Sequence, residues 1–108
     1  MARLDSYHLY GPAFTKFGAG QLGRQDAESA RQGEHDGLGA ISGLSMRADE
    51  LKIDLFRDVA IATFILNYSF KASNDTIQKS ERSTLVLVKD GEAWKIVHEH
   101  FSAFKPQQ

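Results

Sequence analysis

The second half of the chain is a succession of strand-like segments joined by very short connections. Residues 51–55 alternate apolar and polar side chains, the two-residue period of a half-buried strand. Residues 59–70 are apolar or β-favouring at nearly every position, so we expect this strand to be covered on both faces and to lie near the middle of its sheet. Two further strands are expected at about 78–89 and 93–104, the last one ended by Pro106.

The connections between these segments decide how the strands are arranged. The turn sequences at 57–58, 73–75 and 90–91 are all too short for a parallel crossover, which needs a dozen residues or more. The last of them, Asp90-Gly91, is a strong hairpin signal. The pattern therefore predicts an antiparallel meander and excludes a doubly wound parallel sheet for this half of the chain.

The first half is more polar and richer in glycine. Residues 7–10 predict a short strand, and residues 24–35 predict a polar helix whose few apolar positions are alanine. This half supplies little apolar surface to cover a long sheet. Because 108 residues have room for one core, we expect a single α+β domain over residues 1–108, with reduced helical cover.

The composition argues against several classes of partner and site. The 13 basic and 14 acidic residues nearly balance, so we expect neither nucleic acid nor an anionic membrane as a partner. The absence of cysteine excludes disulfides and thiolate chemistry. No apolar run is long enough for a signal peptide or a membrane span, so we expect a soluble cytoplasmic protein.

The last expected hairpin carries the most specific sequence pattern. It reads RSTLVLVKDG at 82–91 and WKIVHEHFS at 94–102. This pattern resembles the C-terminal hairpin of the SnoaL-like branch of the NTF2-like superfamily, which includes polyketide cyclase-like proteins and the association domain of calmodulin-dependent kinase. The resemblance covers residues 44–105.

The resemblance implies a cone-shaped fold: a curved, mainly antiparallel sheet with helices in its concavity, a pocket between them, and homodimers formed through the outer face of the sheet. Family members usually begin with one or two apolar helices. We expect those helices to be missing here, which would leave the pocket open or filled by another subunit.

The resemblance leaves two classes of function open. One is a non-catalytic protein that binds a small apolar or anionic molecule, or that associates with itself as a homodimer or a higher homo-oligomer. The other is a cofactor-independent cyclase, isomerase or dehydratase that uses general acid–base chemistry on a small apolar substrate. We favour the first, because catalysis requires that water be excluded, and a chain without its covering helices excludes water poorly.

The register of the last hairpin decides which side chains share a face. A two-residue loop at Asp90-Gly91 would pair Arg82 with Glu99, whereas a longer loop with a bulge would gather four polar side chains on one surface. These four are the ligand-binding candidates Arg82, Thr84, His98 and His100. We favour the shared surface, which would suit a carboxylate, a phosphate or an enolate oxygen.

His98 and His100 have the two-residue spacing of a metal-chelating pair on one face of a strand. A metal needs three or four ligands, and the sequence places no third ligand beside them. We therefore expect one histidine to have a structural role and the other to line the pocket, with no metal and no cofactor.

Two acidic residues and two tyrosines complete the candidates. Asp54 and Glu99 are the local candidates for a general base, but alternation along the strands is expected to turn both towards solvent or an interface. Tyr10 and Tyr68 are expected to contact a ligand, since a phenol suits the rim of a pocket. The phenylalanines and Trp94 are assigned to packing.

The segment 18–23 matches the dinucleotide-binding pattern GxGxxG. That pattern binds pyrophosphate only between a strand and a helix of a parallel βαβ unit. Because the downstream meander offers no parallel sheet, we expect a mobile loop here instead of a nucleotide site.

Overall fold

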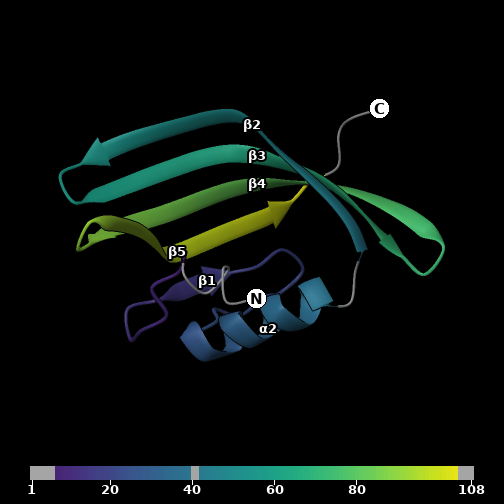
Figure 1. The fold of residues 1–108 in the computed structure, drawn as a ribbon, viewed down its shortest axis with the longest axis horizontal. Coiled ribbons are helices and arrows are strands. Elements are labelled where there is room, and N and C mark those ends of the chain that lie inside the picture. Colours follow the sequence, from purple (N-terminus) through teal and green to yellow (C-terminus); the bar gives the residue numbers. More distant parts are fainter. Residues whose placement is uncertain (1–6, 40–41, 105–108) are drawn as a thin grey trace.

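The computed structural model of the chain describes residues 7–39 and 42–104. It contains one five-stranded sheet and one helix among these residues (Figure 1). The elements are β1 (Thr15–Phe17), α2 (Ala27–Gly39), β2 (Ser42–Phe56), β3 (Val59–Ala72), β4 (Asp75–Asp90) and β5 (Ala93–Ala103).

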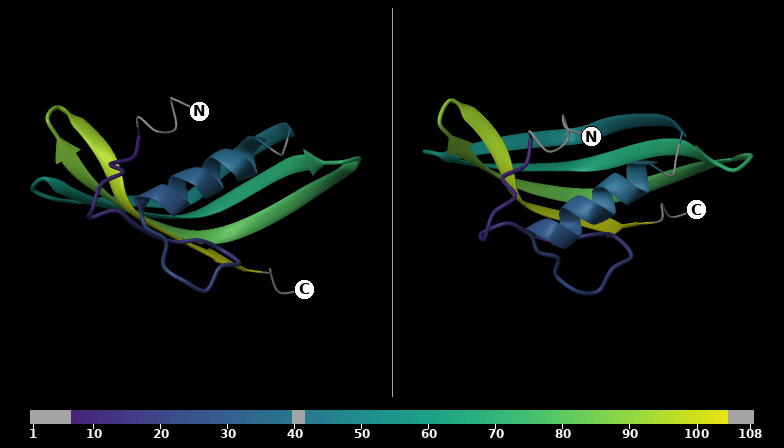
Figure 2. Two further views of the ribbon diagram at one scale, coloured as in Figure 1. Left: turned by 90° about the horizontal axis from the view of Figure 1, so that it is seen from below. Right: turned by 60° about the horizontal axis from the view of Figure 1, so that its bottom comes forward.

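The four long strands form the predicted meander. Their order in the sheet is β1-β5-β4-β3-β2, and every neighbouring pair from β5 to β2 is antiparallel. The short strand β1 joins the other edge in parallel with β5, so the sheet is mixed, though mainly antiparallel. Figure 2 shows that the sheet is strongly curved and that α2 lies across its inner, concave face. The α+β fold class is confirmed.

The long strands are connected by two-residue loops at 57–58, 73–74 and 91–92. The first residue of each loop has positive φ: 58° at Arg57, 58° at Ser73 and 67° at Gly91. Such loops match the right-handed twist of the flanking strands, and only glycine adopts this conformation without a steric cost. Because Asp90 pairs with Ala93, the last loop is 91–92, one residue later than the predicted Asp90-Gly91.

Strand β3 differs from its prediction in both position and burial. It is the second strand from one edge, and β4 occupies the middle of the sheet. Ala60 and Ala62 are buried on the inner face, but Val59 and Ile61, which point the other way, are only half-buried. Among the described residues no element packs over this outer face, and so the expected two-sided cover is wrong.

Helix α2 begins three residues later than predicted. The side chain of Asp26 accepts hydrogen bonds from the backbone N–H of Ser29, at 3.0 Å, and from its hydroxyl, at 2.8 Å. This is an N-cap interaction, and it holds the pKa of the Asp26 carboxyl below its ordinary value. The helix buries Ala30, and Phe14 from the segment after the N-terminal turn is also buried.

Two other predictions for the strands are corrected. The alternating side chains of 51–55 lie in β2 as expected, but Ile53 and Leu55 are 58% and 67% exposed. The reason is that α2 does not extend over this edge. Residues 7–10 form only an isolated bridge, His8 with Ile96, and the first strand of the sheet comes later, at β1.

Pro106 falls outside the described residues. Within the described ranges, no helix has the length and apolar character needed to cross a lipid bilayer.

Candidate functional site

A β-bulge in β5 determines which side chains point into the concavity. The pairing runs regularly from Asp90 with Ala93 to Leu87 with Ile96, and then shifts so that Val86 pairs with His98. Val97 is the extra residue. If β5 alternated strictly through Val97, the side chain at 99 would point outwards; the bulge at Val97 turns Glu99 inwards.

The same register places the four polar ligand-binding candidates on the outer face. Thr84 pairs with His100, Arg82 with Ser102, and Val86 with His98, so all these side chains leave the sheet on the side away from α2. The shared surface exists, but it is not the surface of the concavity.

The outer-face candidates do not form one continuous site. Arg82, Thr84 and His100 contribute to a shallow hollow of about 380 Å³. His98 does not line this hollow, and its Nδ1 lies 2.8 Å from the Thr15 hydroxyl. The guanidinium of Arg82 lies 4.7 Å from the ring centre of Phe104, and the two form a cation–π contact. Ligand binding at these residues remains a prediction.

The inner face holds a buried group of polar side chains under α2. We call His8, Lys16, Glu34 and Glu99 the inner cluster. His8 and Glu99 are 6% and 4% exposed, and His8 Nε2 is hydrogen-bonded to Glu99 Oε1. His8 Nε2 also lies 3.8 Å from Glu34 Oε2. Lys16 Nζ donates to Glu34 Oε1 at 2.8 Å and lies 3.5 Å from Glu99 Oε2. The cluster thus ties the N-terminal segment, β1, α2 and β5 together.

The pKa values of the two carboxyls in the inner cluster are shifted in opposite directions. Burial raises the pKa of Glu99, and the nearby Glu34 raises it further, although the hydrogen bond with His8 opposes both effects. Burial alone would raise the pKa of Glu34. The hydrogen bonds with Glu99, Lys16 and Tyr10 have a larger, opposite effect, so the pKa of Glu34 lies below its ordinary value. The surroundings therefore move the pKa values of these two neighbouring carboxyls apart.

The expectation that Glu99 faces solvent or an interface is therefore wrong, because Glu99 is among the most buried polar side chains described. Asp54 is exposed on β2, as expected, and pairs with Lys52 at 3.4 Å. The sequence offered no sign of the other cluster members, since His8 and Glu99 are 91 positions apart. The one available signal was an acidic residue between two histidines in an otherwise apolar strand.

The two candidate tyrosines lie in different places. Tyr10 belongs to the inner cluster's surroundings: its ring stacks on His8 with centres 4.9 Å apart, and its hydroxyl donates to Glu34 Oε2 at 2.5 Å. Tyr68 lies towards the far end of β3, where its hydroxyl donates to Glu81 Oε2 at 2.5 Å. Burial, and then the Glu81 carboxylate, raise the pKa of Tyr68.

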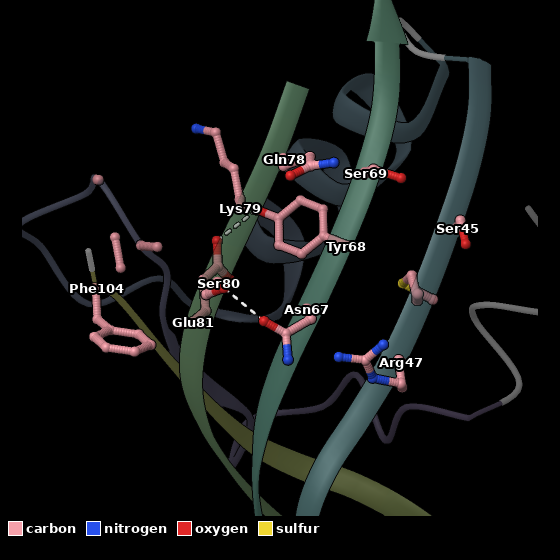
Figure 3. A pocket seen from close by; sticks show the side chains of 14 residues that line it. Ser45, Arg47, Asn67, Tyr68, Ser69, Gln78, Lys79, Ser80, Glu81 and Phe104 are labelled. Carbon is pink, nitrogen blue, oxygen red and sulfur yellow. Dashed lines mark hydrogen bonds between the residues drawn. The ribbon is translucent and has the colours of Figure 1, made fainter. Parts of the chain in front are cut away.

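Tyr68 and Glu81 line the larger hollow, of about 990 Å³ (Figure 3). It lies where β2, β3 and β4 extend beyond α2, with Met46 on the inner face of β2. The close-up shows the Tyr68 ring reaching across from β3 towards Glu81 on β4, and Ser80 hydrogen-bonded to Asn67. The full lining is Ala19, Gly20, Ser45, Met46, Arg47, Asn67, Tyr68, Ser69, Gln78, Lys79, Ser80, Glu81, Ala103 and Phe104.

The glycine-rich segment 18–23 is a loop between β1 and α2, as predicted. The helix that follows presents the carboxylate of Asp26 at its N-terminus, where a pyrophosphate would have to bind. Helix α2 also leads to β2 at the opposite edge of the sheet, so no parallel βαβ unit is formed.

Comparisons with known proteins agree on the fold. The family model described as "SnoaL-like domain" matches residues 1–106. No curated protein matches the sequence.

Several solved structures superpose on most of the chain. One, from Streptomyces avermitilis and assigned as a dehydratase of the NTF2-like family, has a TM-score of 0.78 at 12% identity and covers 86% of this chain and 67% of its own. A second, assigned as a calcium/calmodulin-dependent protein kinase II association domain from Xanthomonas campestris, has a TM-score of 0.76 at 17% identity and covers 89% and 69%. A third, assigned as a ketosteroid isomerase from Shewanella frigidimarina, has a TM-score of 0.72 at 25% identity and covers 94% and 80%.

Proposed function

Because the chain belongs to the SnoaL-like domain family, we propose that it binds a small, largely apolar molecule against the inner face of its sheet and associates with a second copy of itself through the outer face. The observation that carries the binding proposal is the uncovered inner surface of β2. Met46, Ile53 and Leu55 point to the same face as the buried alanines of β3, yet they are 62%, 58% and 67% exposed.

Exposed apolar side chains on the concave side of a sheet are a common feature of ligand sites, in which a few polar groups fix the orientation of the ligand. The adjoining hollow supplies such groups in Tyr68 and Glu81, whose hydrogen bond is already in place before a ligand arrives. An apolar molecule with one polar end matches this combination.

The inner cluster does not favour catalysis over binding. A general acid or base must come within hydrogen-bond distance of its substrate. His8 and Glu99 lie beneath α2 at 6% and 4% exposure, and neither lines either of the two hollows described above. The acid–base chemistry of a dehydratase or an isomerase is therefore the less favoured alternative.

The binding proposal can be tested with a dye whose fluorescence rises in apolar surroundings, together with native mass spectrometry to detect any co-purified molecule. We expect Met46→Asp and Ile53→Asp to weaken dye binding about 10-fold, which corresponds to about 1.4 kcal/mol. Leu22→Asp is the matched control, because Leu22 is 100% exposed and lines neither of the two hollows. Equal losses in all three variants, or no dye binding by the wild type, would contradict the proposal.

Self-association is supported by the half-buried aliphatic residues of the outer face, which no other element in the described part of the chain covers. Ile61 of β3 and Val86 of β4 lie beside each other there. Several structures with the same fold are assigned as kinase association or hub domains. A sheet face of this kind can form a symmetric two-fold interface with its own copy.

Sedimentation equilibrium of two matched isoleucine variants tests which face is used. Ile61 lies on the outer face of β3, and Ile53 lies on the inner face of the neighbouring strand β2. We expect Ile61→Lys to shift the dimer to monomer, with a dissociation constant at least about 10-fold higher, and Ile53→Lys to leave it unchanged. Dissociation by Ile53→Lys alone would reverse the assignment of the faces, and a wild-type monomer at every concentration would refute the dimer.

A further inference from the structure

Three side chains of the inner cluster carry the atoms that bind divalent metals. They are the imidazole of His8 and the carboxylates of Glu34 and Glu99, and one ligand atom from each lies within 4.8 Å of the other two. Their side chains are only 4%, 12% and 5% exposed. Bonds of about 2.0–2.2 Å to a tetrahedral metal hold ligand atoms roughly 3.4 Å apart, so small side-chain movements would bring all three onto one ion.

A second observation points to a missing ligand in the same place. Glu99 Oε2 is a buried oxygen without a hydrogen-bond partner, the one such side-chain atom found in the described part of the chain. The Lys16 ammonium, 3.5 Å away, attracts it without donating a hydrogen bond to it. Leaving a buried carboxylate oxygen unsatisfied costs free energy, and a bound cation would remove that cost.

We propose that His8, Glu34 and Glu99 bind one divalent transition-metal ion of the Zn²⁺ type. One imidazole with two carboxylates suits Zn²⁺, Mn²⁺ or Fe²⁺ better than Ca²⁺ or Mg²⁺, which prefer oxygen ligands alone. Tyr10 supports the site from outside the ligand set. It donates to Glu34 and stacks on the His8 ring, and contacts of this kind hold metal ligands in position. This site is separate from the pair His98 and His100, at which no metal was expected and which lies on the outer face.

Lys16 is the natural competitor of the metal. Its ammonium contacts both carboxylates, at 2.8 and 3.5 Å. Its side chain is 15% exposed, so it reaches the rim of the cluster. A divalent cation that binds between His8 and the carboxylates must do so against the positive charge of Lys16. Removing that charge should tighten metal binding, whereas it should only weaken a purely structural ion-pair cluster.

The test is a calorimetric titration of the purified full chain with Zn²⁺ alone, so its result does not depend on whether the small-molecule proposal is right. We expect one ion per chain, with affinity lowered about 100-fold or more in Glu99→Gln and Glu34→Gln and raised in Lys16→Met. Glu28→Gln is the matched control, since Glu28 is a carboxylate on the same helix with a side chain that is 75% exposed.

A spectroscopic measurement on the wild type gives a test that does not depend on whether the variants fold. Co²⁺ held by three protein ligands in four- or five-fold coordination absorbs visible light far more strongly than hydrated Co²⁺. We expect this strong absorption, and its loss when excess Zn²⁺ is added.

Three results would overturn the metal site. The first is that the wild type does not bind Zn²⁺. The second is that His100→Asn abolishes binding while Glu34→Gln retains it, and the third is that folded Lys16→Met binds Zn²⁺ more weakly than the wild type.

Discussion

The two edges of the sheet use their side chains in opposite ways. At the β5 edge, helix α2 and the N-terminal segment bury charged and polar side chains, with His8 and Glu99 at 6% and 4% exposure. At the β2 edge, large apolar side chains such as Ile53 and Leu55 are more than half exposed. In most proteins the distribution is the reverse, with charged side chains exposed and large apolar side chains buried. The contrast indicates that the β5 side is packed by the N-terminal elements of this chain, whereas the β2 edge presents large apolar side chains that no described element covers.

The largest expected difference in stability between the two sides of the sheet comes from removing the buried carboxyl on β5. We expect Glu99→Ala to lower the free energy of unfolding by about 3 kcal/mol, because it removes the buried carboxyl that is hydrogen-bonded to His8 and lies 3.5 Å from Lys16. Asp54→Ala, at an exposed carboxylate of β2, should change it by less than about 0.5 kcal/mol. Urea denaturation measures both. Equal effects would mean that the inner cluster is not the anchor that its contacts indicate.

Packing gives a second, smaller contrast. Ala62 is 6% exposed on the inner face of β3, so Ala62→Leu should overpack this face and cost about 2 kcal/mol. Leu55→Ser, which alters a side chain that is 67% exposed, should cost less than about 0.5 kcal/mol in dilute protein. Thermal denaturation at several protein concentrations checks this. A large cost for Leu55→Ser that grows with concentration would show that the β2 edge is already occupied by a second copy.

The pH dependence of stability provides the finest test. The pKa of Glu99 is raised in the folded metal-free protein, so its protonated carboxyl stabilises the fold at low pH, and this contribution is lost as the pH rises from the ordinary value of 4.5 through the raised one. The lowered pKa of Glu34 acts oppositely, giving a contribution that is lost as the pH falls.

We therefore compare the wild type with Glu99→Gln. Above pH 4.5 the stability of the wild type should fall relative to that of the variant, by at most about 1.4 kcal/mol per pH unit. Glu28→Gln, which alters an exposed carboxylate, should run parallel to the wild type. A wild-type curve that rises relative to Glu99→Gln would mean that Glu99 is ionised in the folded state.

Much of the fold could be predicted because its information is local. The alternation in 51–55, the apolar run 59–70 and the short turns each specify a strand or a reversal within a few residues. Burial could not be predicted in the same way. The apolar pattern of β2 is that of a half-buried strand, and only the reach of α2 decides that nothing in the described chain covers Ile53.

The candidate site was harder to predict, because it depends on contacts between distant segments. The prediction that Arg82, Thr84 and His100 share one face is confirmed, because this arrangement depends only on the pairing of strands within one hairpin. Which face they occupy depends on the curvature of the sheet and the position of α2. The meeting of His8 with Glu99 across the fold could not be read from a single sequence.

The single extra residue Val97 has a consequence for changes in chain length. Deleting it would straighten β5 yet leave every later side chain pointing where it points now, because the strand would return to strict alternation after Ile96. Adding one more residue at the same place would also allow strict alternation, because two extra residues complete one period, but it would move the remainder of β5 two residues along β4 and carry Glu99 away from His8. Length variation at this position should therefore be strongly asymmetric, with shortening tolerated and lengthening not.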